Sequence, residues 1–318
     1  MKGLYQIGVS SASFFPSMFA AILTTFCFAA SAVLARRSAG MLGSQSANLA
    51  RQAVALVLLG LWAHCIGQGV RGPGLLLFIC SGMLGFGLGD IALFEALPRL
   101  GAGLTVLIVQ CLAVPIGAVT EWIWIGTRIT PAQMLGAAVI LSGVALAIAP
   151  ERQSQIPRGH RMAGLIFAII GAFGQAWGAV VSRQGFVLDK NIGLQMDGPS
   201  SAYQRLLGGI VCVAVVAGIS SLLRRWRQSG QTQPERPWRL AMPWILGNAV
   251  AGPVLGVTFY QWGLRDCPSG VVLSIVSTTP LAVMMLSFVF EKTNPSSRAL
   301  IGSLLAVLGV VALVSGRF

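Results

Sequence analysis

Hydrophobic residues come in runs of roughly 20 positions, separated by short polar stretches. Such a run has the length of a helix that crosses a bilayer, whereas surface helices of soluble proteins carry narrow apolar stripes. The pattern predicts spans near residues 14–35, 47–66, 75–97, 104–126, 132–149, 163–182, 203–223, 242–263, 270–290 and 299–316. They leave no room for a sizeable soluble domain. The predicted fold class is an all-α integral membrane protein with about ten transmembrane helices.

The polar residues refine this prediction. Of the 318 residues, 55% are hydrophobic and 10% are charged, and the net charge is +13. Lys and Arg lie at the ends of the runs and in short loops, where such residues anchor a protein at a lipid surface. We therefore expect membrane lipid, and no nucleic acid, as their partner. The six cysteines lack CxxC spacing, so we expect neither a disulfide framework nor a metal site.

The first apolar run matches a run in the middle of the chain. Residues 20–36 (AAILTTFCFAASAVLAR) align without a gap on residues 167–183 (FAIIGAFGQAWGAVVSR). Lys2 and the apolar stretch up to Ala32 resemble a cleavable signal peptide. A cleaved leader has no reason to copy a mid-chain helix, so we predict that 14–35 is a retained first span.

The repeat extends over both halves of the chain. Arg51, at the start of the second span, corresponds to Arg205. Later positions that correspond in the same order are Pro115, Pro131, Gly136, Gly143 and Val144 with Pro280, Pro295, Gly302, Gly309 and Val310. We predict two five-helix domains, 14–149 and 163–316. Because five is odd, the second repeat must be inverted in the membrane, as in many secondary transporters with a site between the halves.

Two long segments carry a family resemblance. Residues 85–148 read GFGLGDIALFEALPRLGAGLTVLIVQCLAVPIGAVTEWIWIGTRITPAQMLGAAVILSGVALAI, and residues 257–314 read VTFYQWGLRDCPSGVVLSIVSTTPLAVMMLSFVFEKTNPSSRALIGSLLAVLGVVALV. Each is similar to the second part of an EamA domain, and the whole chain resembles the drug/metabolite transporter superfamily. The resemblance implies two EamA-like repeats, transport of a small metabolite or drug-like solute, and export.

One family position differs between the repeats. In this family a glutamate usually follows the fourth span of each repeat. The second repeat has Glu291 in FVFEK, but the first has Thr127 in IGTR. We therefore assign this position no conserved role.

Two indications of orientation disagree. Lys and Arg are concentrated in the loops after odd-numbered spans, so the positive-inside rule places these loops in the cytoplasm and both termini outside. The family resemblance implies that both termini are cytoplasmic. The orientation stays open, and the argument for a site between the repeats does not depend on it.

Polar side chains inside the runs are candidates for a substrate site, because they are costly in a membrane. Asp90 lies well inside the third span and either lines a cavity or pairs with a basic residue such as Arg51 or Arg205. Glu121 follows Gln110 by eleven residues, which places both within roughly 20° of one helix face. Glu121 therefore either lines the same cavity as Gln110 or reaches interfacial water.

Three more candidates lie on the sixth and eighth spans. Gln175 corresponds to the apolar Phe28 in the first repeat, so it marks a position where a symmetric scaffold becomes selective for a substrate. Asn248 and Tyr260 add an amide and a phenol at similar depth.

Small and hydroxyl residues complete the candidates. Ser277 and Thr278 precede Pro280, so their hydroxyls either bind substrate or satisfy backbone groups that the proline frees. Gly82, Gly85 and Gly89 recur at helical spacing and predict close helix packing.

Motifs for enzymatic chemistry are missing from the sequence. His64 and His160 are the only histidines, and neither has metal-like spacing to another ligand. No nucleophile with a neighbouring base is visible. We therefore expect no enzymatic activity, no catalytic or metal-ligating residue and no cofactor.

These observations together predict a multi-pass secondary transporter of the cytoplasmic (inner) membrane that exports a small-molecule solute by alternating access. Proton coupling through Asp90 and Glu121 is a hypothesis, because carboxylates in a membrane are typical proton carriers. Two alternatives stay open: a flippase for a lipid-linked substrate on the same scaffold, and a membrane scaffold that transports nothing. The oligomeric state is not predicted.

Overall fold

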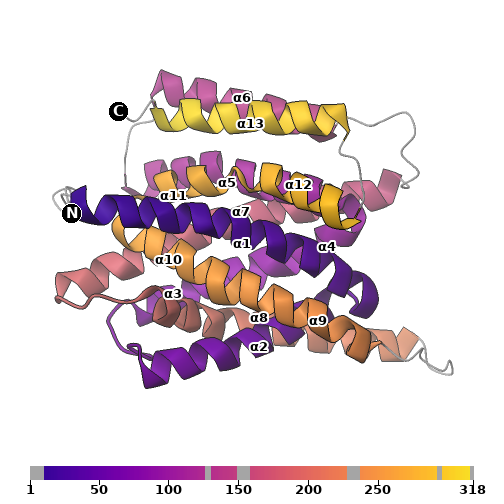
Figure 1. Ribbon diagram of the computed structural model, residues 1–318, viewed down its shortest axis with the longest axis horizontal. Coiled ribbons are helices and arrows are strands. Elements are labelled where there is room, and N and C mark those ends of the chain that lie inside the picture. The colour runs from indigo at the N-terminus through magenta and orange to yellow at the C-terminus, as the bar shows by residue number, and fades with distance from the viewer. Residues whose placement is uncertain (1–10, 126–129, 149–157, 228–236, 292–295, 316–318) are drawn as a thin grey trace.

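The described part of the protein is mostly helical, and its helices are joined by short turns and loops. The computed structural model describes residues 11–125, 130–148, 158–227, 237–291 and 296–315 (Figure 1). Its elements are α1 (Ser11–Leu42), α2 (Ser44–Cys65), α3 (Leu75–Gly82), η1 (Met83–Gly89), α4 (Asp90–Leu100), α5 (Ala102–Ile125), α6 (Pro131–Ile148), α7 (Arg158–Asn191), α8 (Gly198–Arg227), α9 (Trp238–Ala249), η2 (Val250–Gly256), α10 (Val257–Asp266), α11 (Ser269–Val276), α12 (Thr279–Glu291) and α13 (Ser297–Ser315).

Every predicted span has a helical counterpart. The elements α3, η1 and α4 form one span, as do α9, η2 and α10, and α11 and α12 form another. Among the described residues, eight spans are long and apolar enough to cross a membrane, and two shorter apolar helices belong to α6 and α13. The prediction of about ten transmembrane helices in an all-α fold is confirmed.

The outer surface of the bundle is apolar. Phe19, Leu76, Ile123, Trp226 and Met285 are between 60% and 79% exposed. A continuous apolar surface of this kind promotes aggregation in water, but in a bilayer its surroundings are hydrocarbon.

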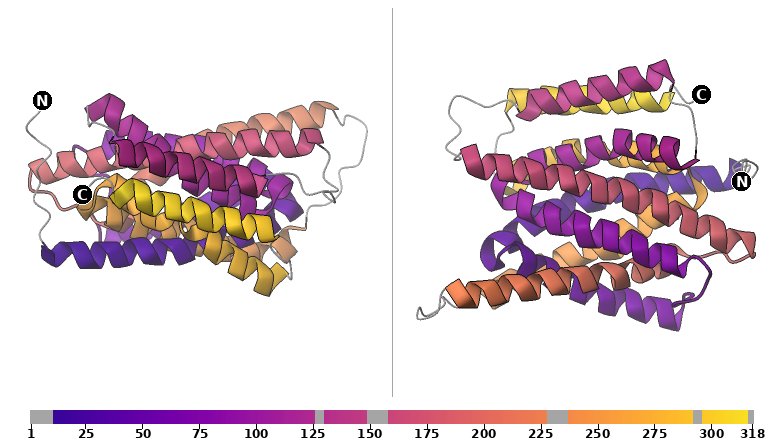
Figure 2. Two further views of the ribbon diagram at one scale, coloured as in Figure 1. Left: turned by 90° about the horizontal axis from the view of Figure 1, so that it is seen from above. Right: turned by 180° about the vertical axis from the view of Figure 1, so that it is seen from behind.

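The last helices of the two repeats form a layer of their own. The α6 and α13 helices lie side by side along one face of the bundle (Figures 1 and 2). Glycine allows the two backbones to approach: a Cβ atom on Gly143 would lie 2.5 Å from the backbone nitrogen of Ala306, and one on Gly302 would lie 2.8 Å from that of Ala147. Small residues at a crossing are typical of helix packing in membranes.

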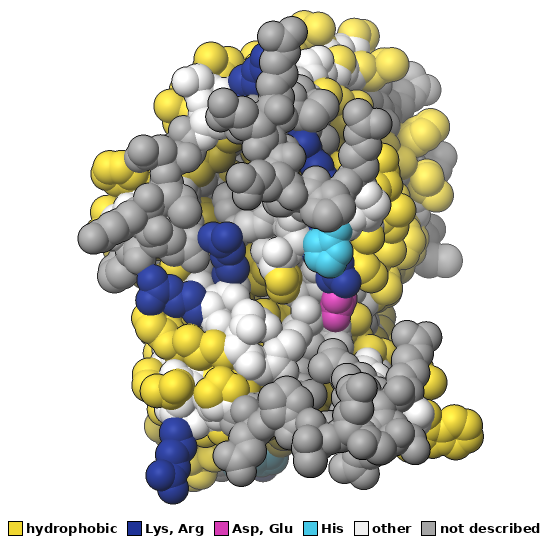
Figure 3. Space-filling model, turned by 90° about the vertical axis from the view of Figure 1, so that its right-hand side faces the viewer, with side chains coloured by type: hydrophobic (Ala, Val, Ile, Leu, Met, Phe, Trp, Pro, Cys, Tyr) yellow, Lys and Arg dark blue, Asp and Glu magenta, His cyan; other side chains and the backbone are white. Residues whose placement is uncertain are grey.

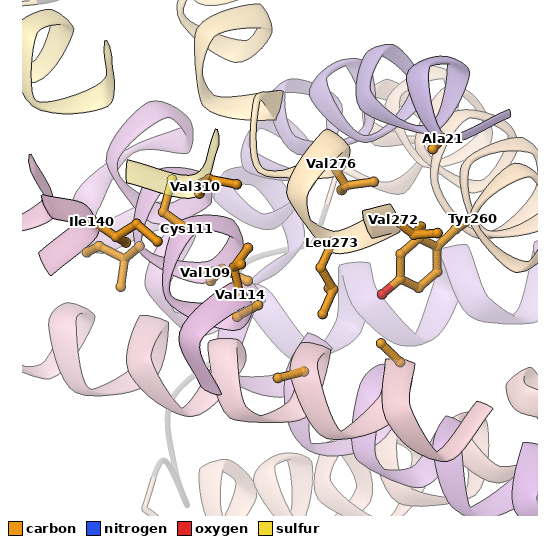
Figure 4. Packing of buried hydrophobic residues seen from close by; sticks show 14 of the residues in the cluster. Ala21, Val109, Cys111, Val114, Ile140, Tyr260, Val272, Leu273, Val276 and Val310 are labelled. Atoms are coloured by element: carbon orange, nitrogen blue, oxygen red, sulfur yellow. The ribbon is translucent and has the colours of Figure 1, made fainter. Parts of the chain in front are cut away.

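The buried apolar core lies where the spans of the two repeats meet. Val109 and Val114 on α5 lie near Leu273 and Val276 on α11, and Tyr260 on α10 belongs to the same cluster (Figure 4). This packing holds α5, α10 and α11 around the centre of the bundle.

One end of the bundle carries several basic side chains. The right-hand end of Figure 1 faces the viewer in Figure 3, where several Lys and Arg side chains stand among apolar ones. Arg37 lies over the ring of Trp244 at 4.4 Å from its centroid, and Arg99 lies over the ring of Phe167 at 5.2 Å. Arginine and aromatic side chains together are typical of the membrane surface.

The third and eighth spans are each interrupted by seven residues of π-helix, η1 and η2. Both segments are rich in glycine and end in one, Gly89 and Gly256. Since π-helical turns are rare overall and are frequently found at functional sites, their matching positions direct attention to the space between them.

Candidate functional site

Two arginines mark equivalent places in the two repeats. Arg51 on α2 and Arg205 on α8 are each 4% exposed. Each lies against the π-helical segment of the other repeat: a Cβ atom on Gly252 would lie 3.0 Å from a guanidinium nitrogen of Arg51, and one on Gly85 would lie 2.7 Å from one of Arg205. The glycines therefore make room for the guanidinium groups.

Arg51 has an acidic partner, a second hydrogen-bond acceptor and an aromatic ring beside it. It forms an ion pair with Asp90, the first residue of α4, which the end of η1 places beside it. Its Nε donates to the side-chain oxygen of Asn48 at 3.1 Å, and its guanidinium lies 4.7 Å from the ring centroid of Phe94. The positive charge of Arg51 is therefore balanced inside the protein.

The hydrogen-bond and ring partners of Arg205 within the described ranges are neutral. Its Nη1 donates to the side-chain oxygen of Gln261 at 2.7 Å, and Gln261 in turn donates to Ser182 at 2.6 Å. The guanidinium lies 5.6 Å from the ring centroid of Phe86 and 5.9 Å from that of Tyr260. Its Nε has no hydrogen-bond partner among the described residues.

A cavity of about 80 Å³ lies between these arginines, enough for several water molecules. Both repeats supply its walls. The polar residues in its lining are Ser31, Arg51, Asp90, Gln110, Gln175, Arg205 and Tyr260. Apolar walls come from residues such as Phe28, Leu93, Val106, Val109 and Val257.

The structure brings four predicted site residues together at this cavity. Asp90, Gln110, Gln175 and Tyr260 all line it. The sequence left two roles open for Asp90, and the structure shows both: it lines the cavity and it forms an ion pair with Arg51. Gln110 has a buried side-chain oxygen and Tyr260 a buried hydroxyl without a described partner.

Asn248 stands one layer behind the cavity. Its side-chain oxygen accepts a hydrogen bond of 2.7 Å from Ser31, which does line the cavity. Asn248 therefore positions Ser31 and does not itself form the wall.

Three other predicted site residues lie apart from the cavity lining. Glu121 is near the end of α5, where it accepts a hydrogen bond from Ser269 at the start of α11. The Ser277 hydroxyl donates to the carbonyl of Ser274 at 2.7 Å, and that of Thr278 to the carbonyl of Ile275 at 2.7 Å. These hydroxyls satisfy carbonyls at the break between α11 and α12, which is the structural role expected beside a proline.

One position noted in the sequence, the residue after the fourth span of each repeat, lies partly outside the described residues. Thr127 lies outside the described residues, as does the side chain of Glu291. The three glycines of the third span are described, and their predicted role in close packing is confirmed. Gly82 and Gly85 face Arg205, and a Cβ atom on Gly174 would lie 2.6 Å from the backbone of Gly89.

Sequence reasoning missed both arginines as cavity residues. They entered it as corresponding positions of the two repeats and as partners for Asp90. The repeat alignment held the signal, because a pair of charged residues at equivalent places inside an inverted repeat points to the axis between the halves.

A model of the family described as the "EamA-like transporter family" matches residues 15–149 and 162–315. The chain belongs to this family. A solved structure titled "Crystal structure of protein" is similar to this EamA-family chain over 97% of its length and 99% of the other chain, with a TM-score of 0.62 and 17% sequence identity. At that identity the likeness concerns the fold alone. Comparison with curated proteins gave no match.

EamA membership makes the chain a multi-pass membrane protein from a family that transports small solutes. Across the residues that the structure describes, no group of three or more His, Cys, Asp or Glu side chains could hold a metal ion.

A test of the unpartnered phenol of Tyr260 follows from this geometry. In the purified EamA-family protein, Tyr260→Phe is expected to leave the thermal unfolding midpoint unchanged or slightly higher, because it removes a buried polar atom without a described partner. Ser31→Ala should lower stability by about 1 kcal/mol, since it removes the donor to Asn248. A large loss in Tyr260→Phe would contradict this assignment.

Proposed function

We propose that this EamA-family protein is a secondary transporter that exports a small solute across the cytoplasmic membrane by alternating access. The observation that carries the proposal is the cavity between the repeats, with charged, amide and phenol groups from both of them. Ionisable groups at membrane depth mark substrate or ion pathways. The cavity is therefore the substrate site in this proposal.

The two repeats, 14–149 and 163–316, are the units that exchange conformation in this proposal. Equivalent elements carry the two arginines and the two π-helical segments. When one repeat adopts the arrangement of the other, the cavity opens on the opposite side of the membrane.

Individual residues have separate tasks in the proposal. Gln110, Gln175 and Tyr260 bind the solute, and Asn248 holds Ser31 in place. Asp90 carries a proton when its pair with Arg51 opens, which couples transport to a pH gradient. Glu121, Ser277 and Thr278 hold the junction of α5, α11 and α12.

Exchange in proteoliposomes tests the proposal. Vesicles with the purified protein are loaded with a mixed metabolite pool, a pH gradient is imposed, and the solutes that leave are identified by mass spectrometry against protein-free vesicles. We expect selective, gradient-dependent loss of one compound class. No loss in either gradient direction, with the protein shown to be folded, would overturn the proposal in favour of the flippase or scaffold alternatives.

A further inference from the structure

The charged groups around the cavity do not balance. Arg51 and Arg205 each contribute a positive charge, and Asp90 is the one carboxylate among the described residues that line the cavity. That carboxylate is bound to Arg51, and Arg205 makes no ion pair within the described ranges. Asp90 is also close enough to attract Arg205 electrostatically, but two buried positive charges share this one carboxylate, so one positive charge is in excess.

The repeat symmetry shows where the missing counterion would be. Asp90 is the residue directly after η1, and Val257 is the residue directly after η2. Both line the cavity. The first repeat thus places a carboxylate next to its arginine, and the second repeat places an apolar side chain at the corresponding position.

Two hydrogen-bond donors without a described partner lie at the excess positive charge. The Nε–H of Arg205 and the hydroxyl of Tyr260 have no described partner, and the ring of Tyr260 lies 5.9 Å from the guanidinium. A buried guanidinium is costly without an ion-pair partner, and a carboxylate is the acceptor that matches its geometry best.

We infer that the cavity binds a small organic anion. Its charged oxygens are held by Arg205 and the Tyr260 hydroxyl, and its apolar part lies against walls such as Phe28 and Leu93. The free oxygen of Gln110 accepts a donor on the same solute. The inference rests on the proposed function, since it names the substrate class for that site.

Equilibrium binding to the wild-type chain is the first test. The thermal unfolding midpoint of the purified protein in detergent is measured with acetate, benzoate and phenylacetate, each against its neutral amide, and with benzylammonium. A ligand that binds only the folded state raises the midpoint. We expect the carboxylates to stabilise, with benzoate and phenylacetate above acetate, and the amides and benzylammonium to have no effect. If no carboxylate exceeds its amide, the inference is overturned.

Variants that are expected to change benzoate affinity in opposite directions locate the site. Arg205→Gln should weaken benzoate binding at least about tenfold, since it removes charge-assisted hydrogen bonds. Val257→Asp should weaken benzoate binding clearly more than Val257→Asn, because the two side chains have the same shape and only the aspartate supplies a counterion to Arg205. Asp90→Asn should strengthen binding several-fold. Equal effects of Val257→Asp and Val257→Asn, or weaker benzoate binding in Asp90→Asn, would contradict the inference.

Three further outcomes would each overturn one part of the inference or of the proposed function. Stabilisation by dodecyl phosphate but by none of the short carboxylates would assign the anion to a lipid headgroup and overturn the small-solute class. Benzoate binding without flux of any solute would support the anion site and overturn the transporter. Flux of cationic or neutral solutes alone would support the transporter and overturn the anion site.

Discussion

Replacing Asp90 with asparagine is expected to abolish solute exchange driven by a pH gradient, while solute counterflow without a gradient continues. Asp90 is the carboxylate among the described cavity-lining residues, and it lies beside Arg51 in a site that also holds Arg205 and Tyr260. A carboxylate takes up and releases a proton, whereas an amide of the same shape does not. The measurement is tracer exchange in proteoliposomes with and without the gradient.

The choice of asparagine keeps the fold intact. Its side-chain oxygen still accepts a hydrogen bond from Arg51, so the guanidinium keeps an acceptor. Glu95→Gln is the matched control, because Glu95 lies on the same helix but does not line the cavity. It forms an ion pair of 2.5 Å with Arg99. We expect normal gradient-driven exchange in this control. Unchanged coupling in Asp90→Asn would refute the role of Asp90 as proton carrier.

The fold could be predicted from the sequence because the bilayer imposes a simple rule. Backbone groups in hydrocarbon must bond within their own helix, so an apolar run of bilayer length specifies a spanning helix with little dependence on its neighbours. Five such runs per repeat also specify the inverted arrangement. The π-helical segments η1 and η2 were not predicted, because their register depends on packing against neighbouring helices.

The site was harder to predict, because it depends on which faces meet. Gln110 and Glu121 share one helix face in sequence, but Gln110 lies mid-span at the cavity and Glu121 lies near the helix end beside Ser269. Angular position alone carries no information on depth. Asp90 was identifiable because charge is rare inside a span. That its ion pair forms with Arg51 and not with Arg205 depends on distances between helices.

Placing leucine at Gly208 is expected to destabilise the protein by about 3 kcal/mol or more, because α3 and α8 touch through their backbones at this point. A Cβ atom on Gly208 would lie 2.9 Å from the carbonyl carbon of Ile79, and one on Gly82 would lie 2.8 Å from the Cα atom of Arg205. Backbone atoms cannot move aside as a flexible side chain does. Separation of the helices would also displace Arg205 from the cavity, so binding of benzoate should be lost with stability.

Gly218→Leu is the control for this prediction, since Gly218 lies on the same helix and a Cβ atom there would have no neighbour within 4 Å. Its neighbours Val215 and Ile219 are 56% and 53% exposed, which is typical of a lipid-facing surface. Both variants lose the same glycine flexibility and gain the same side chain, so a difference in thermal unfolding midpoint reports the helix contact alone. We expect Gly218→Leu to unfold at the wild-type temperature or above it. Equal midpoints in the two variants would show that α3 and α8 do not approach this closely in the membrane.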